Sequence, residues 1–285
     1  MAQSLKQIKN RIRTIESTEK VTSAMQLISV VKLNSTNRIA YAFKPYSFKL
    51  EAMVRNMAAD EKVRGHPFFE QRRTLDKILL CVITSDNGLC GFYNQSIIRC
   101  AEEFLDKHGR DNCELLVIGK KGWNYFKSKN IKIIHRYLGL NGRYSDIISD
   151  EITSILINLF LTKKANAVHV AHMRFETAAV QKPGVEKLLN IDLPEEGRQT
   201  PYLVEPDIGG LLAELLPKYV KSTMRRIFLE SFVCEHAARS LSMKKATDNA
   251  AELLKNLVLT RNKIRQASIT QDIMEVISSA EALKG

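Results

Sequence analysis

The two ends of the 285-residue chain lack the residues that interrupt regular structure. No glycine or proline occurs from Met1 to Lys44 or from Lys218 to Lys284, whereas all seven prolines and twelve of the thirteen glycines lie between Pro45 and Pro217. Because glycine and proline mark turns, their absence predicts long uninterrupted elements. The sequence therefore predicts two long helical arms that flank a turn-rich middle.

Membrane and redox signals are also scarce. No stretch reaches the ~18–20 uninterrupted apolar residues of a spanning helix, so we expect no direct membrane span. The N-terminus has no apolar core of a secretory signal and lacks the serine-rich character of a transit peptide. The five cysteines are odd in number and form no CxxC pair, which argues against a disulfide framework or zinc site and for reduced thiols in a cytosol-facing protein.

What the chain has in excess is positive charge, with 43 basic against 31 acidic residues and a net charge of +12. Residues 1–64 hold 12 basic and 5 acidic residues, and residues 206–285 hold 12 and 9. Residues 65–205 hold 19 and 17, so almost all of the excess lies on the two arms. This leaves two readings of the arms, a solvated basic face or a surface that meets an acidic partner.

The N-terminal arm shows the spacing of a coiled coil, in which apolar residues at the a and d positions form a seam. We expect one helix over residues 3–44, a kink at Pro45 and continuation to about residue 57. Between residues 15 and 18 the spacing is 3 where 4 is due, which predicts a one-residue phase shift. The predicted seam positions are Leu5, Ile8, Ile12, Ile15, Thr18, Val21, Met25 and Ile28. The cations that fall largely off this seam are Lys9, Arg11, Arg13 and Lys20.

The C-terminal arm has a longer pattern, again with one phase shift, in the gap between residues 241 and 246. At ~1.5 Å per residue, a helix without Gly or Pro from residue 218 to 284 would be roughly 100 Å long, too long to be buried in a globule of this size. Paired antiparallel with the shorter N-terminal arm, its apolar end would overhang, and we expect another protein to surround it. The predicted seam runs through Val220, Met224, Ile227, Ser231, Cys234, Ala238 and Leu241, then Ala246, Ala250, Leu253, Leu257, Thr260, Ile264, Ala267, Gln271 and Met274.

The middle of the chain alternates short apolar runs with helical patterns, which is typical of a mainly parallel α/β sheet. We expect strands at 77–83, 114–118, 131–138, 167–175 and 185–192, and helices at about 94–107, 120–129 and 146–163. The fold class is thus a Rossmann-like α/β domain combined with a long antiparallel two-helix coiled coil. The predicted divisions are 1–57 for the first helix, 74–205 for the α/β domain and 208–285 for the last helix.

The α/β domain lacks the signatures of chemistry. The loop after the first strand, Gly88 to Tyr93, lacks the third glycine of a dinucleotide-binding G-x-G-x-x-G, and no P-loop occurs. His169 and His172 are three apart on a strand, so they should point to opposite faces and not share a metal. We therefore expect no catalytic residues, no metal and no cofactor, although Trp123 and Tyr125 beside two lysines could in principle stack on bases.

Three segments carry a resemblance to a known family. They are IKNRIRTIESTEKVTSAMQLISVVKL (8–33), ITSDNGLCGFYN (83–94) and EHAARSLSMKKATDNAAELLKNLVLTRNKIRQASITQDIMEVISSAEAL (235–283). Together with weaker matches at 45–46 and 202–207, they make the whole chain resemble the γ subunit of bacterial F-type, proton-translocating ATP synthases. The sequence departs from the family at Phe92, where a small residue is usual, and at Glu281, within a tail that is normally small and apolar.

The resemblance implies a non-catalytic rotor subunit in a hetero-oligomer. The arms would form the central stalk inside a ring of α and β subunits, and the α/β domain would lie at the foot, contacting the ε subunit and the c-ring. Rotation driven by protons would bias the conformations of the catalytic β subunits and so drive ATP synthesis. The implied location is peripheral, on the cytoplasmic face of the bacterial inner membrane.

The resemblance also implies roles for particular residues. Arg265 and Gln266 match a pair that bonds a loop of the β subunit, and a guanidinium suits acidic groups of such a loop. Thr270 and Asp272 match nearby coupling positions, and Met25 matches a seam methionine that contacts β. The apolar tip in its bearing would comprise Ile273, Val276, Ile277, Ala280 and Leu283. The foot near the c-ring and ε would include Tyr202, Glu205 and Asp207.

One alternative from a different class stays open on the sequence alone. The basic arms could belong to a coiled-coil nucleic-acid-binding protein, whose binding would depend steeply on salt concentration.

Overall fold

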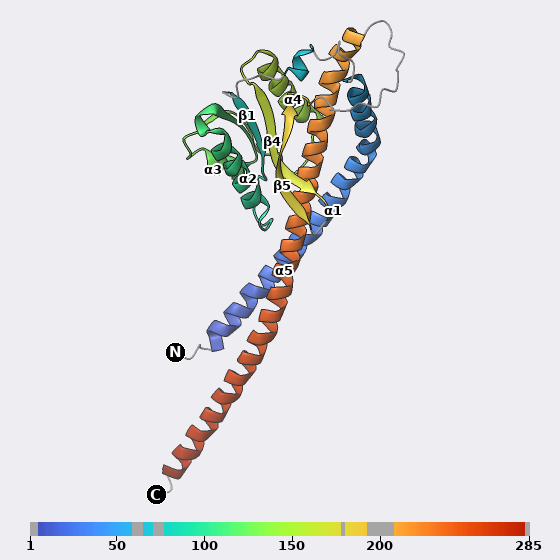
Figure 1. Ribbon diagram of the computed structural model, residues 1–285. Coiled ribbons are helices and arrows are strands. Elements are labelled where there is room, and N and C mark those ends of the chain that lie inside the picture. The colour runs from blue at the N-terminus through green and yellow to red at the C-terminus, as the bar shows by residue number, and fades with distance from the viewer. Residues whose placement is uncertain (1–4, 59–64, 71–76, 178–179, 193–207, 283–285) are drawn as a thin grey trace. The chain divides into compact units, whose positions relative to one another are not determined.

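A computed structural model describes residues 5–58, 65–70, 77–177, 180–192 and 208–282. Two long helices dominate it, α1 at Leu5–Met57 and α5 at Ile208–Ala282 (Figure 1). As predicted, α1 continues beyond Pro45 to residue 57. The chain divides into two compact units, one of Met1–Ile28 with Ser240–Gly285 and the other of Ser29–Arg239, so each long helix contributes to both.

The larger unit is built on a five-stranded sheet. The strands are β1 (Ile78–Ile83), β2 (Cys113–Ile118), β3 (Lys132–Tyr137), β4 (Ala167–Phe175) and β5 (Gln181–Leu189), in the order β3-β2-β1-β4-β5. All neighbouring pairs are parallel except β4 and β5. This confirms the predicted Rossmann-like sheet. The last strand begins four residues earlier than predicted and includes Pro183, which an edge strand accommodates.

Helices cover both faces of this sheet. The shorter helices are α2 (Tyr93–His108), α3 (Lys120–Phe126) and α4 (Asp146–Leu161), and two 3-10 turns lie at Pro67–Phe69 and Arg110–Asn112. Because side chains alternate along a strand, Leu79, Cys81 and Ile83 of β1 face one cluster, and Ile78, Leu80 and Val82 face another. The first cluster includes side chains of α4, of the end of α1 and of α5 from Leu212 to Phe232. The second cluster includes side chains of α2 and α3.

In the smaller unit, α1 and α5 form an antiparallel pair. The Thr22 and Thr247 hydroxyl oxygens are 2.8 Å apart, and nearer the N-terminus Ile8 and Ile12 cluster with Leu257. Earlier positions of α1 thus meet later positions of α5, as the predicted coiled coil requires. This apolar cluster holds the two helices together. Its partly buried members are Ile15, Leu253, Leu254, Val258 and Ile264.

The phase shift predicted in the seam of α1 is wrong. Thr18, Val21 and Ile28 are exposed, and of the shifted positions only Met25 is half-buried. The 3,4 spacing instead continues without a break, through polar side chains that an apolar pattern cannot detect. The buried or half-buried positions that follow it are Leu5, Ile8, Ile12, Ile15, Glu19, Thr22 and Gln26.

The seam predicted on α5 after its phase shift is mostly confirmed. Leu241 and Thr260 are exposed. The predicted positions that are buried or half-buried are Ala246, Ala250, Leu253, Leu257 and Ile264. Thr247, Leu254 and Arg261 are half-buried as well.

We predict that Phe160→Ala lowers the free energy of unfolding by about 3–5 kcal/mol, because Phe160 is fully buried between α4 and the sheet and its ring lies 6.3 Å from that of Phe68. The neighbouring Leu161 is 44% exposed, so Leu161→Ala is the matched control and should cost far less. Denaturant unfolding followed by circular dichroism checks both variants. Equal losses for the two variants would contradict this assignment of the core.

Candidate functional site

The end of α5 has no covering within the described chain. Ile264 is the last half-buried residue, and every described side chain from Arg265 to Glu281 is exposed. Among them, Ile273, Val276 and Ile277 are 54%, 68% and 52% exposed and share one side of the helix by their spacing. The overhang predicted from the lengths of the two arms is therefore confirmed, and it carries a large unsatisfied apolar stripe.

The residues predicted to contact a β subunit occupy two different environments. Arg265, Gln266, Thr270 and Asp272 are exposed on this overhang, where the Thr270 hydroxyl donates to the Gln266 carbonyl at 3.0 Å. Met25 is half-buried on α1. The structure thus groups four of the five along one exposed segment and leaves Met25 apart from them.

Only some of the remaining predicted site residues lie within the described part of the chain. Ala280 is exposed with the apolar tip residues, and Glu281 is exposed too. Leu283, Tyr202, Glu205 and Asp207 lie outside the described residues.

The cations of the paired arms face solvent. On α1, Lys9, Arg11, Arg13 and Lys20 are exposed, as predicted from their positions off the seam. On α5, the exposed cations after residue 240 are Lys244, Lys245, Lys255, Lys263 and Arg265. The smaller unit, as far as it is described, contains no ion pair, so this positive charge is not neutralised within it. The surface suits acidic groups of another molecule.

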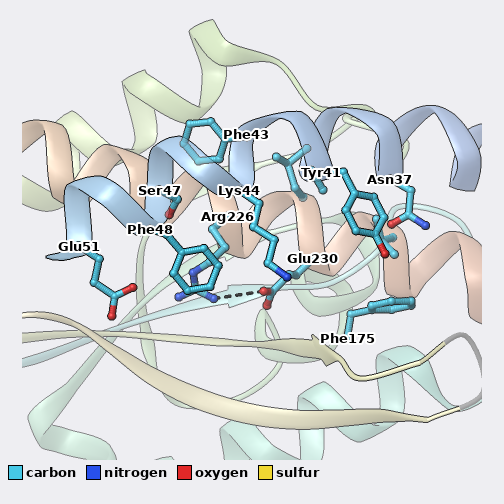
Figure 2. A pocket seen from close by; sticks show the side chains of 13 residues that line it. Asn37, Tyr41, Phe43, Lys44, Ser47, Phe48, Glu51, Phe175, Arg226 and Glu230 are labelled. Atoms are coloured by element: carbon cyan, nitrogen blue, oxygen red, sulfur yellow. Dashed lines mark hydrogen bonds and ion pairs between the residues drawn. The ribbon is translucent and has the colours of Figure 1, made fainter.

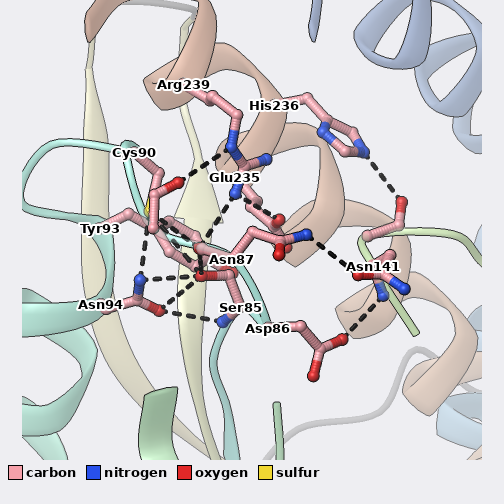
Figure 3. A network of polar contacts seen from close by, with 12 residues as sticks. Ser85, Asp86, Asn87, Cys90, Tyr93, Asn94, Asn141, Glu235, His236 and Arg239 are labelled. Atoms are coloured by element: carbon pink, nitrogen blue, oxygen red, sulfur yellow. Dashed lines mark hydrogen bonds and ion pairs between the residues drawn. The ribbon is translucent and has the colours of Figure 1, made fainter. Parts of the chain in front are cut away.

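A polar network fixes the loop between β1 and α2 against α5 (Figure 3). Arg239 donates to the Asn87 and Gly88 carbonyls, each at 3.2 Å, and to Glu235 at 2.8 Å. Burial raises the pKa of Glu235, and the Arg239 guanidinium opposes that rise. Since both residues are buried, loss of either one would leave an uncompensated charge. The loop that resembles the family motif is therefore held rigidly at its backbone.

Phe92 does not disturb this loop. Its side chain is 78% exposed, and the positive φ of 57° that the turn needs falls on Gly91. The departure from the family at this position is accommodated by directing the ring outward.

His236 is buried in the same network. Its Nε2 lies 2.8 Å from the Gly142 carbonyl, so it donates there, and Nδ1 has no partner among the described residues. Burial lowers the pKa of His236 to about 4. Burial likewise lowers the pKa of His169 to about 4, with Lys187 adding to the effect.

Asp86, which follows β1, joins the turns at the carboxyl ends of three neighbouring strands. Its carboxylate accepts hydrogen bonds from the backbone N–H groups of Lys120 and Gly139, both at 3.0 Å, and of Asn141 at 2.7 Å. A side chain at Gly119 would approach the Thr84 carbonyl oxygen to 2.1 Å, so the turn after β2 packs closely on the residue that follows β1. The backbone donors of these turns are therefore satisfied by a carboxylate of the chain itself.

Among the described residues, no group of three or more His, Cys, Asp or Glu side chains could hold a metal ion. His169 stacks on Phe104 of α2, whereas His172 contacts Glu186 on the other face of the sheet. As predicted, the two histidines point in opposite directions.

A groove of about 340 Å³ lies between α1, α5 and the end of β4 (Figure 2). Its walls include Tyr41, Phe48 and Phe175, and Arg226 is held by Glu230 and Glu186. Lys44 lies over the Phe48 ring, its ammonium 5.7 Å from the ring centre, and Glu51 pairs with Arg55. The groove thus combines aromatic walls with charges that are mostly engaged by neighbouring side chains.

Comparison with known proteins identifies the family. A family model described as ATP synthase matches residues 4–283. The ATP synthase gamma chain of Exiguobacterium sibiricum is 36% identical over 280 residues, covering 98% of this chain and 99% of that protein. The ATP synthase gamma chain of Pelotomaculum thermopropionicum is 33% identical over 284 residues, covering 99% of each. The chain belongs to the ATP synthase gamma-chain family.

Solved structures agree on the fold. A chain of the mitochondrial ATP synthase of Euglena gracilis, in a structure of OSCP, F1 and the c-ring, matches with a TM-score of 0.67 at 16% identity, covering 98% of this chain and 94% of that chain. A chain of the central stalk and c-ring structure from Tetrahymena thermophila matches with a TM-score of 0.60 at 20% identity, covering 79% and 99%.

These matches confirm the family resemblance read from the sequence. As a member of this family, the chain is a non-catalytic subunit of an ATP synthase and not an enzyme in its own right. The comparisons give no support to the nucleic-acid-binding alternative. Within the described ranges, no helix combines the length and apolarity that a membrane span requires.

We predict that the free energy of unfolding falls as the pH is lowered from 6.5 to about 5, because the folded protein keeps His236 and His169 buried and neutral. An unfolded histidine binds a proton near pH 6.5, whereas folded His236 and His169 do so only near pH 4, so the unfolded state gains protons first. Each contributes a slope of at most about 1.4 kcal/mol per pH unit. Urea unfolding of the wild type, His236→Gln and the double variant with His169→Gln measures this, and an unchanged slope in the double variant would contradict it.

Proposed function

We propose that this chain is the central-stalk rotor that couples proton-driven rotation of a c-ring to conformational changes in catalytic β subunits, and so drives ATP synthesis. The partners would be the α and β subunits of a catalytic ring, the ε subunit and the c-ring. Family membership and full-length similarity to gamma chains support this role.

The single observation that carries the proposal is the overhang of α5. Seventeen successive residues from Arg265 to Glu281 are exposed, and among them is a stripe of apolar side chains whose exposure to water is unfavourable. An apolar helix end that lacks a covering element requires a protein sleeve, and the exposed cations of the arms suit acidic loops on that sleeve. A shaft that contacts successive β subunits unequally would bias each one's conformational equilibrium without doing chemistry.

The residue roles rest on the family resemblance. We assign Arg265, Gln266, Thr270 and Asp272 to contact with a loop of β, with Met25 as a further contact on α1. Ile273, Val276, Ile277, Ala280 and Leu283 would form the tip in its bearing. Tyr202, Glu205 and Asp207 would belong to the foot near the c-ring and ε.

The placement in the cell follows from these partners. A rotor attached to a c-ring would be a peripheral protein on the cytoplasmic face of the inner membrane of a bacterium. In that assembly, residues 1–57 and 208–285 would act as the shaft and residues 74–205 as a separate domain at its foot.

Reconstitution tests the proposed function directly. Purified α and β subunits should show steady ATPase activity only when this chain is added, because the asymmetric shaft is what makes the three β subunits adopt different states. A phosphate-release assay measures the activity. Addition of the chain without any effect on a competent α and β preparation would overturn the proposal.

We predict that Arg265→Glu weakens coupled ATP synthesis in membrane vesicles by roughly tenfold or more while nucleotide binding to β is retained, since a reversed charge loses a contact to an acidic loop worth at least ~1.4 kcal/mol. Arg265→Lys keeps the charge but loses the planar fork, so it should give an intermediate rate.

Lys255→Glu is the matched control, because it makes the same charge change at an exposed position of the same helix. Synthesis unaffected in Arg265→Glu, or impaired equally in Lys255→Glu, would remove the specific role of Arg265.

A further inference from the structure

A strongly basic stretch of the α/β domain runs through α3, the turn that follows it and β3. Residues 115–145 contain seven Lys or Arg residues and no Asp or Glu, although residues 65–205 as a whole are nearly neutral. The part of this stretch considered below, the α3 patch, consists of Lys120, Lys121, Lys127, Lys129 and Arg136, all of them exposed.

No ion pair joins a cation of the α3 patch to a carboxylate among the described residues, whereas several other cations of the same unit are paired. Elsewhere, Arg99 pairs with Glu103 at 3.0 Å, and Lys182 with Glu176 at 2.8 Å. Close by, Lys132 pairs with Glu114 at 2.6 Å across β2 and β3, and for that reason it is not counted in the patch. Concentrated like charge destabilises an isolated fold, so the patch is costly unless something neutralises it.

Two of these cations are held in place by aromatic rings. The Arg136 guanidinium lies 4.4 Å from the centre of the Trp123 ring, and the Lys129 ammonium lies 5.0 Å from that of Tyr125. Both rings are half-buried against the core cluster of α2 and α3. The cations are therefore preorganised, and a guanidinium laid flat on a ring leaves its N–H edge free for a carboxylate.

We propose, resting on the function proposed above, that the α3 patch is a docking surface for an acidic segment of another protein subunit of the assembled complex. Charge complementarity identifies the class of partner, since five unpaired cations need carboxylates at matching spacing. Recognition would use side chains, because the register shift between Leu115 and Leu116 places a bulge in the outermost strand pair and disfavours addition of a further strand at β3. A bilayer is the poorer occupant, since the two rings that could enter it are covered by cations.

Protection of lysine side chains in the assembled complex tests the proposal. Acetylation of Lys127 and Lys129 should be roughly tenfold slower in the complex than in the full chain alone, as expected for a site occupied about nine-tenths of the time. A carbodiimide, which joins amines to carboxylates without a spacer, should link the same lysines to Asp or Glu of another subunit, located by peptide mass spectrometry.

Charge reversal supplies the decisive comparison. The double variant Lys127→Glu with Lys129→Glu should restore fast acetylation of Lys120 and Lys121 in the complex. Replacing the cross-linked Asp or Glu residues of the partner by Lys should then restore protection of these lysines in the double variant. The control pair, Lys107→Glu with Lys164→Glu, makes the same charge change at exposed positions outside the patch and should leave protection unchanged.

Three results would overturn the proposal. They are equal acetylation rates in the complex and the isolated chain, protection that persists in the charge-reversed variant, and protection that requires vesicles with anionic lipid, which would identify a membrane surface instead. ATPase activity of the same preparations reports assembly of the rotor, so failure at the α3 patch is distinguishable from failure of the proposed function.

Discussion

Burial of the apolar side of α5 is the interaction on which the rest of the structure depends. From Leu212 to Cys234 this side contributes to the cores on the sheet, and from Met243 to Ile264 it lies against α1. Beyond Ile264 the same kind of surface continues with nothing of the described chain upon it. One helix thus joins a folded domain, a helical pair and an exposed end.

Much of this organisation could be predicted from the sequence because it depends on strong local signals. The absence of Gly and Pro predicts α1 and α5, and alternation of apolar runs with helical patterns predicts the parallel sheet. The exposure of Arg265, Gln266, Thr270 and Asp272 follows from the unequal lengths of the arms. The roles of these residues toward another subunit depend on the family resemblance, since no pattern within one chain specifies its partner.

Three features could not be predicted from the sequence, because they depend on tertiary contacts or are averaged out in charge counts. The seam of the helical pair continues through Glu19, Thr22 and Gln26, whose burial comes from the partner helix and not from their own polarity. The α3 patch could not be seen in the net charge of residues 65–205, which is close to zero because acidic residues elsewhere in the α/β domain balance the charge of the patch. The network around Arg239 was also missed, because it joins residues about 150 positions apart.

The carboxylate of Asp86 has a mechanical consequence. It follows β1 and is bonded to three backbone N–H groups in the turns after β2 and β3. One side chain thus ties the carboxyl ends of three neighbouring strands together, so displacing any one of these turns would break a hydrogen bond to a carboxylate.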